Sequence, residues 1–178
     1  MQRDFVLRVD FAPGAVQGPD GHAADLPGAC AAYEAAIAAA GGIDLQILGI
    51  GTDGHIAFNE PGSSLGSRTR LKTLTTQTRA DNARFFDDNI ELVPHHCLTQ
   101  GLATIMSARR LVLIAAGRAK AEAVHKLAEG PVSTMWPATV IQHHPHATVL
   151  IDEGAASRLQ LVTYYREVYA NKPTWQGI

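Results

Sequence analysis

The amino-acid sequence predicts an α/β fold with a mainly parallel sheet, and two observations support this prediction. Three short runs of aliphatic residues, at 43–50, 111–117 and 147–152, are typical of strands buried within a parallel sheet. Segments with helical composition or spacing separate these runs. Strands that alternate with helices along a chain indicate an α/β architecture.

The first part of the chain is predicted to form a loop, a helix and the first strand. Residues 11–25 are rich in Gly, Pro and Asp, a composition that favours a loop. Residues 27–40 contain many alanines, so we expect a helix that ends at the pair Gly41-Gly42. The strand at 43–50 then leads into a glycine-rich turn.

The second part of the chain continues the alternation. A polar, β-branched stretch at 67–76 precedes a segment at 78–86 with helical spacing, for which Thr78 is the candidate N-cap. Pro94 is expected to open a further helix over 98–108. The remaining elements are a strand at 111–117, a helix at 118–128, a short helix at 136–142, a strand at 147–152, and a C-terminal helix that contains Tyr164, Tyr165 and Tyr169.

Length and charge limit the possible classes of function. A chain of 178 residues can bury a core within one domain, which we place at residues 1–178. The net charge of -2 comes without a long acidic or basic block, so nucleic acid is not the expected partner. No apolar run is long enough to cross a membrane, and residues 1–5 lack the pattern of a signal peptide. These observations predict a soluble, cytoplasmic protein without a membrane partner.

The most informative segment is the glycine-rich turn at 51–64, which places Asp53, His55 and Glu60 close together in the sequence. The turn follows a strand, and ligands of open α/β sheets bind at the carboxyl ends of strands. A histidine beside carboxylates suits proton transfer between a sugar ring oxygen and a hydroxyl. Because no Ser or Cys nucleophile accompanies these groups, proton shuttling fits them better than acyl transfer.

Two other interpretations of this turn remain to be weighed. The spacing Gly49-x-Gly51-x-x-Gly54 is that of a dinucleotide-binding fingerprint, but an irregular segment follows where a helix should open, and no acidic residue lies near position 74. Alternatively, the glycines merely make a tight turn, and His55 is a loop histidine without a catalytic role.

Basic, histidine and cysteine residues provide further candidates. Arg84 and Lys120 follow or face strand ends, where they could bind a phosphate; taken singly, each is more often a solvated surface charge. Histidines 95, 96, 143, 144 and 146 straddle prolines in predicted loops, so metal binding there is disfavoured. Cys30 and Cys97 lack metal-ligand spacing and are expected to be reduced, buried thiols.

Several segments together resemble the glucosamine-6-phosphate deaminase family. The match runs from Met1 to about residue 165, and its segments are Gly51-Thr-Asp-Gly-His-Ile-Ala-Phe-Asn-Glu-Pro61, Ser67-Arg-Thr-Arg-Leu-Lys-Thr-Leu-Thr75, Ala83-Arg-Phe-Phe86, Ala115-Ala-Gly-Arg-Ala-Lys-Ala121, Glu129-Gly-Pro-Val-Ser-Thr-Met-Trp136 and His144-Pro-His-Ala147. The resemblance implies a Rossmann-like three-layer fold whose first strands are missing here, so that the chain corresponds to the C-terminal two-thirds of the family's domain.

The resemblance also implies an activity and site residues. Glucosamine 6-phosphate and water would be converted to fructose 6-phosphate and ammonium in amino-sugar breakdown, without a redox cofactor or an essential metal. His55 would be the ring-opening base, with Asp53 and Glu60 orienting it and balancing its charge. Arg84 and Lys120 match the family's phosphate contacts. Some members form homo-oligomers and bind N-acetylglucosamine 6-phosphate as an activator; the matching positions are Ser63, Arg70 and Lys72.

One departure from the family keeps a second class of function open. Relatives carry, ahead of the point that matches Met1, a phosphate-binding loop and the aspartate that takes the C2 proton during enolisation. The alternative is therefore a catalytically incomplete sugar-phosphate-binding module. A 6-phosphogluconolactonase, which shares the general fold, is disfavoured because residues 59–64 and 67–70 resemble the deaminases instead.

Overall fold

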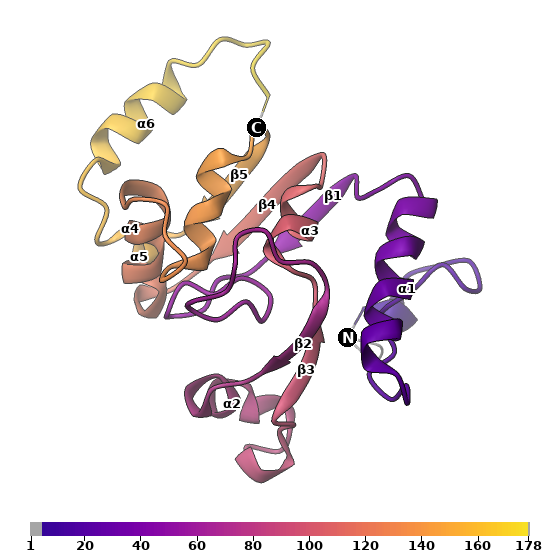
Figure 1. The fold of residues 1–178 in the computed structure, drawn as a ribbon. Helices are drawn as coiled ribbons and strands as arrows, with labels where there is room; N and C mark the ends of the chain where they lie inside the picture. Colours follow the sequence, from indigo (N-terminus) through magenta and orange to yellow (C-terminus); the bar gives the residue numbers. More distant parts are fainter. Residues whose placement is uncertain (1–4, 178) are drawn as a thin grey trace.

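A parallel sheet of three strands forms the body of the computed structural model, which describes residues 5–177 (Figure 1). The strands are β1 (Leu45–Leu48), β4 (Arg110–Ala115) and β5 (Ala147–Ile151), and their order in the sheet is β1-β4-β5. Both neighbouring pairs are parallel, with Leu48 opposite Leu113 and Leu113 opposite Val149. The predicted α/β fold with a mainly parallel sheet is confirmed.

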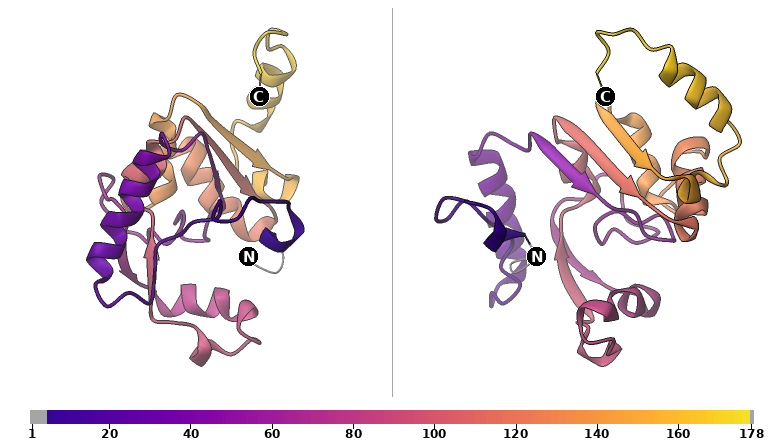
Figure 2. Two further views of the ribbon diagram at one scale, coloured as in Figure 1. Left: turned by 90° about the vertical axis from the view of Figure 1, so that its right-hand side faces the viewer. Right: turned by 180° about the vertical axis from the view of Figure 1, so that it is seen from behind.

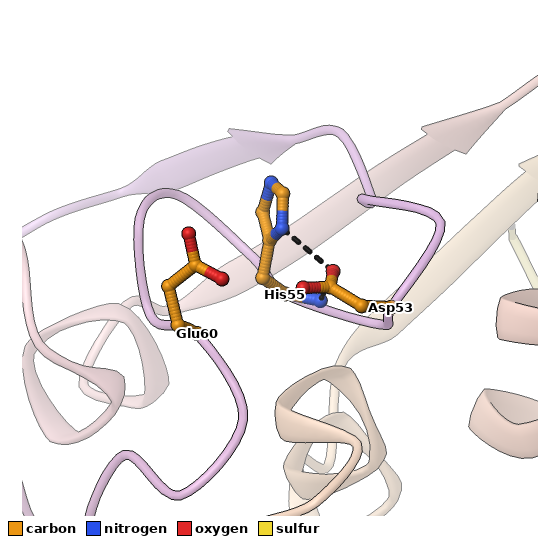
Figure 3. Close-up of side chains that lie close together, drawn as sticks. All are labelled: Asp53, His55 and Glu60. Atoms are coloured by element: carbon orange, nitrogen blue, oxygen red, sulfur yellow. Dashed lines mark hydrogen bonds and ion pairs between the residues drawn. The ribbon is translucent and has the colours of Figure 1, made fainter. Parts of the chain in front are cut away.

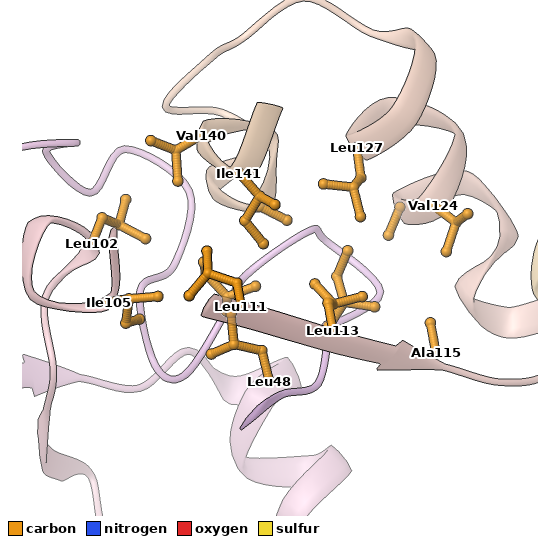
Figure 4. Close-up of a cluster of buried hydrophobic side chains, with 14 of the residues drawn as sticks. Leu48, Leu102, Ile105, Leu111, Leu113, Ala115, Val124, Leu127, Val140 and Ile141 are labelled. Carbon is orange, nitrogen blue, oxygen red and sulfur yellow. The ribbon is translucent and has the colours of Figure 1, made fainter. Parts of the chain in front are cut away.

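One face of this sheet carries the hydrophobic core (Figure 4). Helices α3 (Leu102–Met106) and α4 (Ala121–Glu129) and the 3-10 segment η5 (Pro137–His143) supply the side chains that pack against it. Each fully buried aliphatic side chain contributes about 1.5–3 kcal/mol to folding. The larger members are Leu48, Leu111 and Leu113 from the sheet, Ile50 and Ile56 from the segment that follows β1, and Leu102, Ile105, Val124, Leu127, Val140 and Ile141 from the covering elements.

The opposite face of the sheet is apolar and exposed. Side chains alternate between the two faces of a strand, and burial along β4 alternates accordingly. The relative exposures are 51% for Leu45, 63% for Ile47 and 51% for Ile114. In the described part of the chain, helices therefore cover the sheet on one side, and the other side presents aliphatic residues to solvent.

A two-stranded antiparallel ribbon projects from the body (Figure 2). It consists of β2 (Arg70–Thr73) and β3 (His96–Thr99), which α2 (Thr76–Asn82), η2 (Ala83–Phe85) and η3 (Ile90–Leu92) connect. We refer to residues 70–99 as the ribbon module. It was not predicted as a strand pair.

The prediction of a helix over 98–108 is wrong at its N-terminal end, where the second strand of this ribbon forms instead. Residues 96–99 are extended because they pair with β2, and helix α3 begins only after Gly101. A Cβ atom on Gly101 would lie 2.1 Å from the carbonyl oxygen of Ser67, so only glycine allows the chain to turn there. Propensity alone did not reveal the partner strand.

The cap of α2 also differs from the prediction. Thr75 is the N-cap, and its Oγ1 accepts a hydrogen bond from the backbone N–H of Thr78 at 3.1 Å. Thr78 is itself 2% exposed and lies inside the helix. The helical segment at 78–86 breaks into α2 and η2 at Asn82.

The other predicted elements are found close to their expected positions. They are α1 (Leu26–Ala39), η4 (Arg118–Lys120) leading into α4, η5, and α6 (Val162–Ala170), while η1 (Val6–Arg8) and the short α5 (Glu153–Ala156) were not predicted. Cys30 is buried and Cys97 is half-buried, and both thiols are free. No helix within residues 5–177 has the length and apolar character needed to cross a membrane.

Candidate active site

The turn after β1 is shaped by two glycines. Gly51 accepts from the backbone N–H of Gly54 at 3.1 Å and donates to the carbonyl of His55 at 2.9 Å. A Cβ on Gly51 would lie 2.3 Å from the imidazole of His55, and Gly54 has a φ of 81° with Trp136 packed against it. The glycines thus let the imidazole ring fold back over its own backbone.

Asp53 holds this imidazole in one orientation (Figure 3). Its Oδ1 lies 2.7 Å from Nδ1 of His55 and also accepts from the backbone N–H of His55 at 3.1 Å. Partial burial tends to raise the pKa of Asp53, but these hydrogen bonds outweigh it and lower the pKa to about 2. An ionised carboxylate only accepts, so Nδ1 carries the proton and Nε2 is left to exchange one with a ligand.

Glu60 lies on the other side of the imidazole ring (Figure 3). It is 5% exposed, and its Oε1 accepts a 2.6 Å hydrogen bond from Oγ1 of Thr78. One ligand-type atom from each of Asp53, His55 and Glu60 lies within 4.8 Å of the others. This closeness would also suit a shared cation, but Oδ1 and Nδ1 already engage each other, so the geometry favours proton transfer. We call these three residues the relay.

The residues just before Glu60 connect the turn to the ribbon module and to Gln100, the residue that follows it. Phe58 donates its backbone N–H to Oγ1 of Thr99 at 3.1 Å. The fully buried Asn59 donates to the carbonyl of Gln100 at 2.8 Å and accepts from Nη1 of Arg70 at 2.9 Å. Sequence reasoning missed the contacts of Asn59, although this residue lies within the motif, and it considered Thr78 only as a helix cap and not as a partner of Glu60.

The two candidate phosphate ligands lie on different parts of the fold. Arg84 is exposed on η2, where its guanidinium lies 4.8 Å from the ring centroid of Phe85. Lys120 is half-buried on η4, after β4 and the left-handed Gly117. In the described structure neither makes a hydrogen bond or ion pair with the relay.

The candidate activator residues and the histidine pairs have separate surroundings. Ser63 is buried, and its Oγ has no partner among the described residues, whereas Arg70 contacts Asn59 and Lys72 is half-buried on β2. His144 is structural, because its Nε2 lies 2.8 Å from the carbonyl of Ala108 and its Nδ1 accepts from the backbone N–H of His146.

The parallel sheet, with titratable side chains gathered where one of its strands ends, has the architecture of an α/β enzyme. The sequence model of the family described as glucosamine-6-phosphate isomerases/6-phosphogluconolactonase matches residues 1–150. The chain therefore belongs to this family, on the branch of the glucosamine-6-phosphate deaminases, as the individual relatives show.

Two curated relatives and one solved structure document this placement. The glucosamine-6-phosphate deaminase of Beutenbergia cavernae is 71% identical over 178 residues, which cover 100% of this chain and 68% of that protein. The deaminase of Mycolicibacterium smegmatis is 76% identical over 174 residues, or 98% of this chain and 67% of that protein. A monomeric glucosamine-6-phosphate deaminase of known structure superposes with a TM-score of 0.85 at 46% identity, covering 89% of this chain and 65% of that one.

These comparisons confirm the family predicted from the sequence and the Rossmann-like α/β fold. The chain spans about two thirds of the length of the curated relatives it matches. The high identities to deaminases argue against the 6-phosphogluconolactonase alternative.

Proposed function

We propose that the relay performs the ring-opening acid–base step of glucosamine-6-phosphate deamination, the reaction in which glucosamine 6-phosphate and water give fructose 6-phosphate and ammonium. The observation that carries the proposal is the 2.7 Å contact between Asp53 and Nδ1 of His55, with Glu60 beside the ring. This arrangement leaves Nε2 as the atom that faces a ligand.

Ring opening follows from this geometry. Nε2 of His55 takes the proton of the anomeric hydroxyl and returns a proton to the ring oxygen as the bond between C1 and that oxygen breaks. Asp53 keeps Nδ1 protonated, and the two carboxylates balance the positive charge that the imidazole carries between the two transfers.

Arg84 and Lys120 are proposed to hold the substrate phosphate. Lys120 follows β4 and so belongs to the same sheet edge as the turn after β1, because parallel strands end at the same edge. Arg84 comes from the ribbon module, which Asn59 and Glu60 join to the turn. Neither cation pairs with a carboxylate in the described part of the chain, which leaves both available to an anion.

Regulation and assembly are proposed on the family resemblance. Ser63, Arg70 and Lys72 would bind N-acetylglucosamine 6-phosphate, and the bond from Arg70 to Asn59 supports a link between that site and the relay. We further propose that the protein forms a homo-oligomer and that residues 1–178 form a single domain. We place it in the cytoplasm, where sugar phosphates are metabolised. The solved relative at 46% identity is monomeric.

The test measures ammonium release from glucosamine 6-phosphate by the chain and by a version extended at its N-terminus to the length of its relatives, here called the extended version. His55→Gln should lower kcat by about 10²–10⁴-fold, the contribution of a positioned acid–base group. His125→Gln is the matched control, since His125 pairs with Glu129 on α4 instead. Activity of the His55 variant within a few-fold of the parent would contradict the proposal.

The same assay separates the enzyme from the alternative of a sugar-phosphate-binding module. A module would bind glucosamine 6-phosphate in a calorimetric titration, yet would release no ammonium in either version. Turnover by the extended version alone would instead show that the relay works together with groups outside this chain.

A further inference from the structure

Thr78 makes a contact with the relay that no catalytic motif indicates. Its side chain is 2% exposed, and its Oγ1 donates a 2.6 Å hydrogen bond to Oε1 of Glu60. The second carboxylate oxygen, Oε2, is buried without a hydrogen-bond partner among residues 5–177. In the described structure Thr78 is thus the only hydrogen-bond donor to this carboxylate.

A second hydroxyl fixes the direction of this hydrogen bond. Oγ1 of Thr75 donates to Oγ1 of Thr78 at 3.0 Å. A hydroxyl has one proton to give, and Thr78 receives that of Thr75, so its own proton points to Glu60. The length of 2.6 Å lies in the range of about 2.5–2.7 Å that is usual for a hydroxyl bound to an ionised carboxylate.

We propose that Thr78 is a positioning residue, which orients the Glu60 carboxylate toward His55. The inference rests on the proposed function of the relay. Thr78 belongs to α2 of the ribbon module, whereas Glu60 belongs to the turn after β1, so the hydroxyl joins the two parts of the fold at the reacting groups.

Several charged or titratable groups lie near Glu60, and each could contribute to the pH dependence of the activity. Asp53 and His55 lie on the same turn, and Cys97 faces Glu60 from β3, with Arg70 and Lys72 beyond it. Burial, followed by the charge of Glu60, raises the pKa of Cys97 to about 11, so this thiol is neutral. Asp53 stays ionised above about pH 2. Neither Cys97 nor Asp53 therefore changes its charge near neutral pH.

The test compares Thr78→Val, which keeps the shape and removes the donor, with Thr78→Ser, which keeps the donor. Both are made in the extended version, and kcat, KM and the pH dependence of kcat are measured. Loss of the hydrogen bond to a charged group should lower kcat of the valine variant by about 10- to 100-fold, with little change in KM. Its activity should also decline at a higher pH on the acid side, while the serine variant keeps the parent profile.

The outcomes separate this inference from the proposed function. If His55→Gln abolishes turnover while Thr78→Val keeps the kcat and pH profile of the parent, the positioning role is wrong and the relay stands. If His55→Gln leaves turnover intact, the relay and the role of Thr78 are both wrong. If the valine variant fails to fold, Thr78→Cys replaces it, because the thiol is a weak donor of similar size. The cysteine variant should shift the pH profile of kcat in the same direction by a smaller amount. An unshifted pH profile would overturn the proposal.

Discussion

Replacement of Asp53 by asparagine is expected to change both catalysis and stability, because one carboxylate holds the imidazole and is stabilised by it. Oδ1 of Asp53 accepts from Nδ1 and from the backbone N–H of His55. Asparagine keeps the size of the side chain but removes the charge, so the imidazole can adopt the other tautomer and loses the stabilisation of its protonated form.

The stability effect can be worked out from the pKa of Asp53. Although partial burial raises this pKa, the hydrogen bonds from His55 lower it from 3.8 to about 2, which corresponds to about 2.4 kcal/mol. The side chain of Asp53 is 38% exposed, so solvent screening reduces the expected loss in unfolding free energy to about 1–2 kcal/mol at pH 7. Because the folded-state pKa is the lower one, this contribution is complete above about pH 4 and disappears as the pH falls toward 2.

The measurements are urea unfolding at several pH values and ammonium release by the extended version. Asp53→Asn should be less stable than the parent at pH 7, equally stable at pH 2, and slower in kcat by about 10²-fold or more. Asp10→Asn, at an exposed loop position, is the control. A stability difference that is the same at pH 7 and at pH 2, or a kcat within twofold of the parent, would refute the reasoning.

Three further predictions concern the turn and the two faces of the sheet. Gly54→Ala should cost about 1–3 kcal/mol in thermal or urea unfolding, since φ is 81° and the new Cβ would lie 2.6 Å from Cε3 of Trp136; an unchanged midpoint would contradict this. Leu113→Ala should cost about 2–5 kcal/mol because Leu113 is 1% exposed, and a loss below 1 kcal/mol would mean that the core relaxes into the cavity. Ile47→Lys should reduce binding of a hydrophobic dye to the isolated chain without lowering its stability, because Ile47 is 63% exposed; equal dye binding would show that the open face is not the binding surface.

The sequence predicted the parts of the fold that local patterns determine. The strands β4 and β5 and the helices α1, α4 and α6 are found within a few residues of their expected positions, because their apolar periodicity, alanine content and bounding glycines are local signals. The ribbon was missed because β2 and β3 are separated along the chain by α2, and each is short and half-exposed. Such a strand acquires its structure from its partner, which no window of sequence contains.

The candidate site was predictable to a similar degree. Asp53, His55 and Glu60 lie within one short motif, so their closeness could be expected, and the structure brings them together. The roles of Asn59 and Thr78 depend on contacts across the fold, at 41 and 18 residues of sequence separation, and these follow from the ribbon that sequence reasoning missed.

The relay lies where two parts of the structure meet, the turn after β1 and the ribbon module. His55 and Asp53 are held by the turn itself, through bonds that span at most a few residues. Glu60 is held by the ribbon module through Thr78, and its neighbour Asn59 is held by Arg70. The Glu60 carboxylate is therefore held by a different part of the fold from the imidazole, and the hydroxyl of Thr78 connects the two parts.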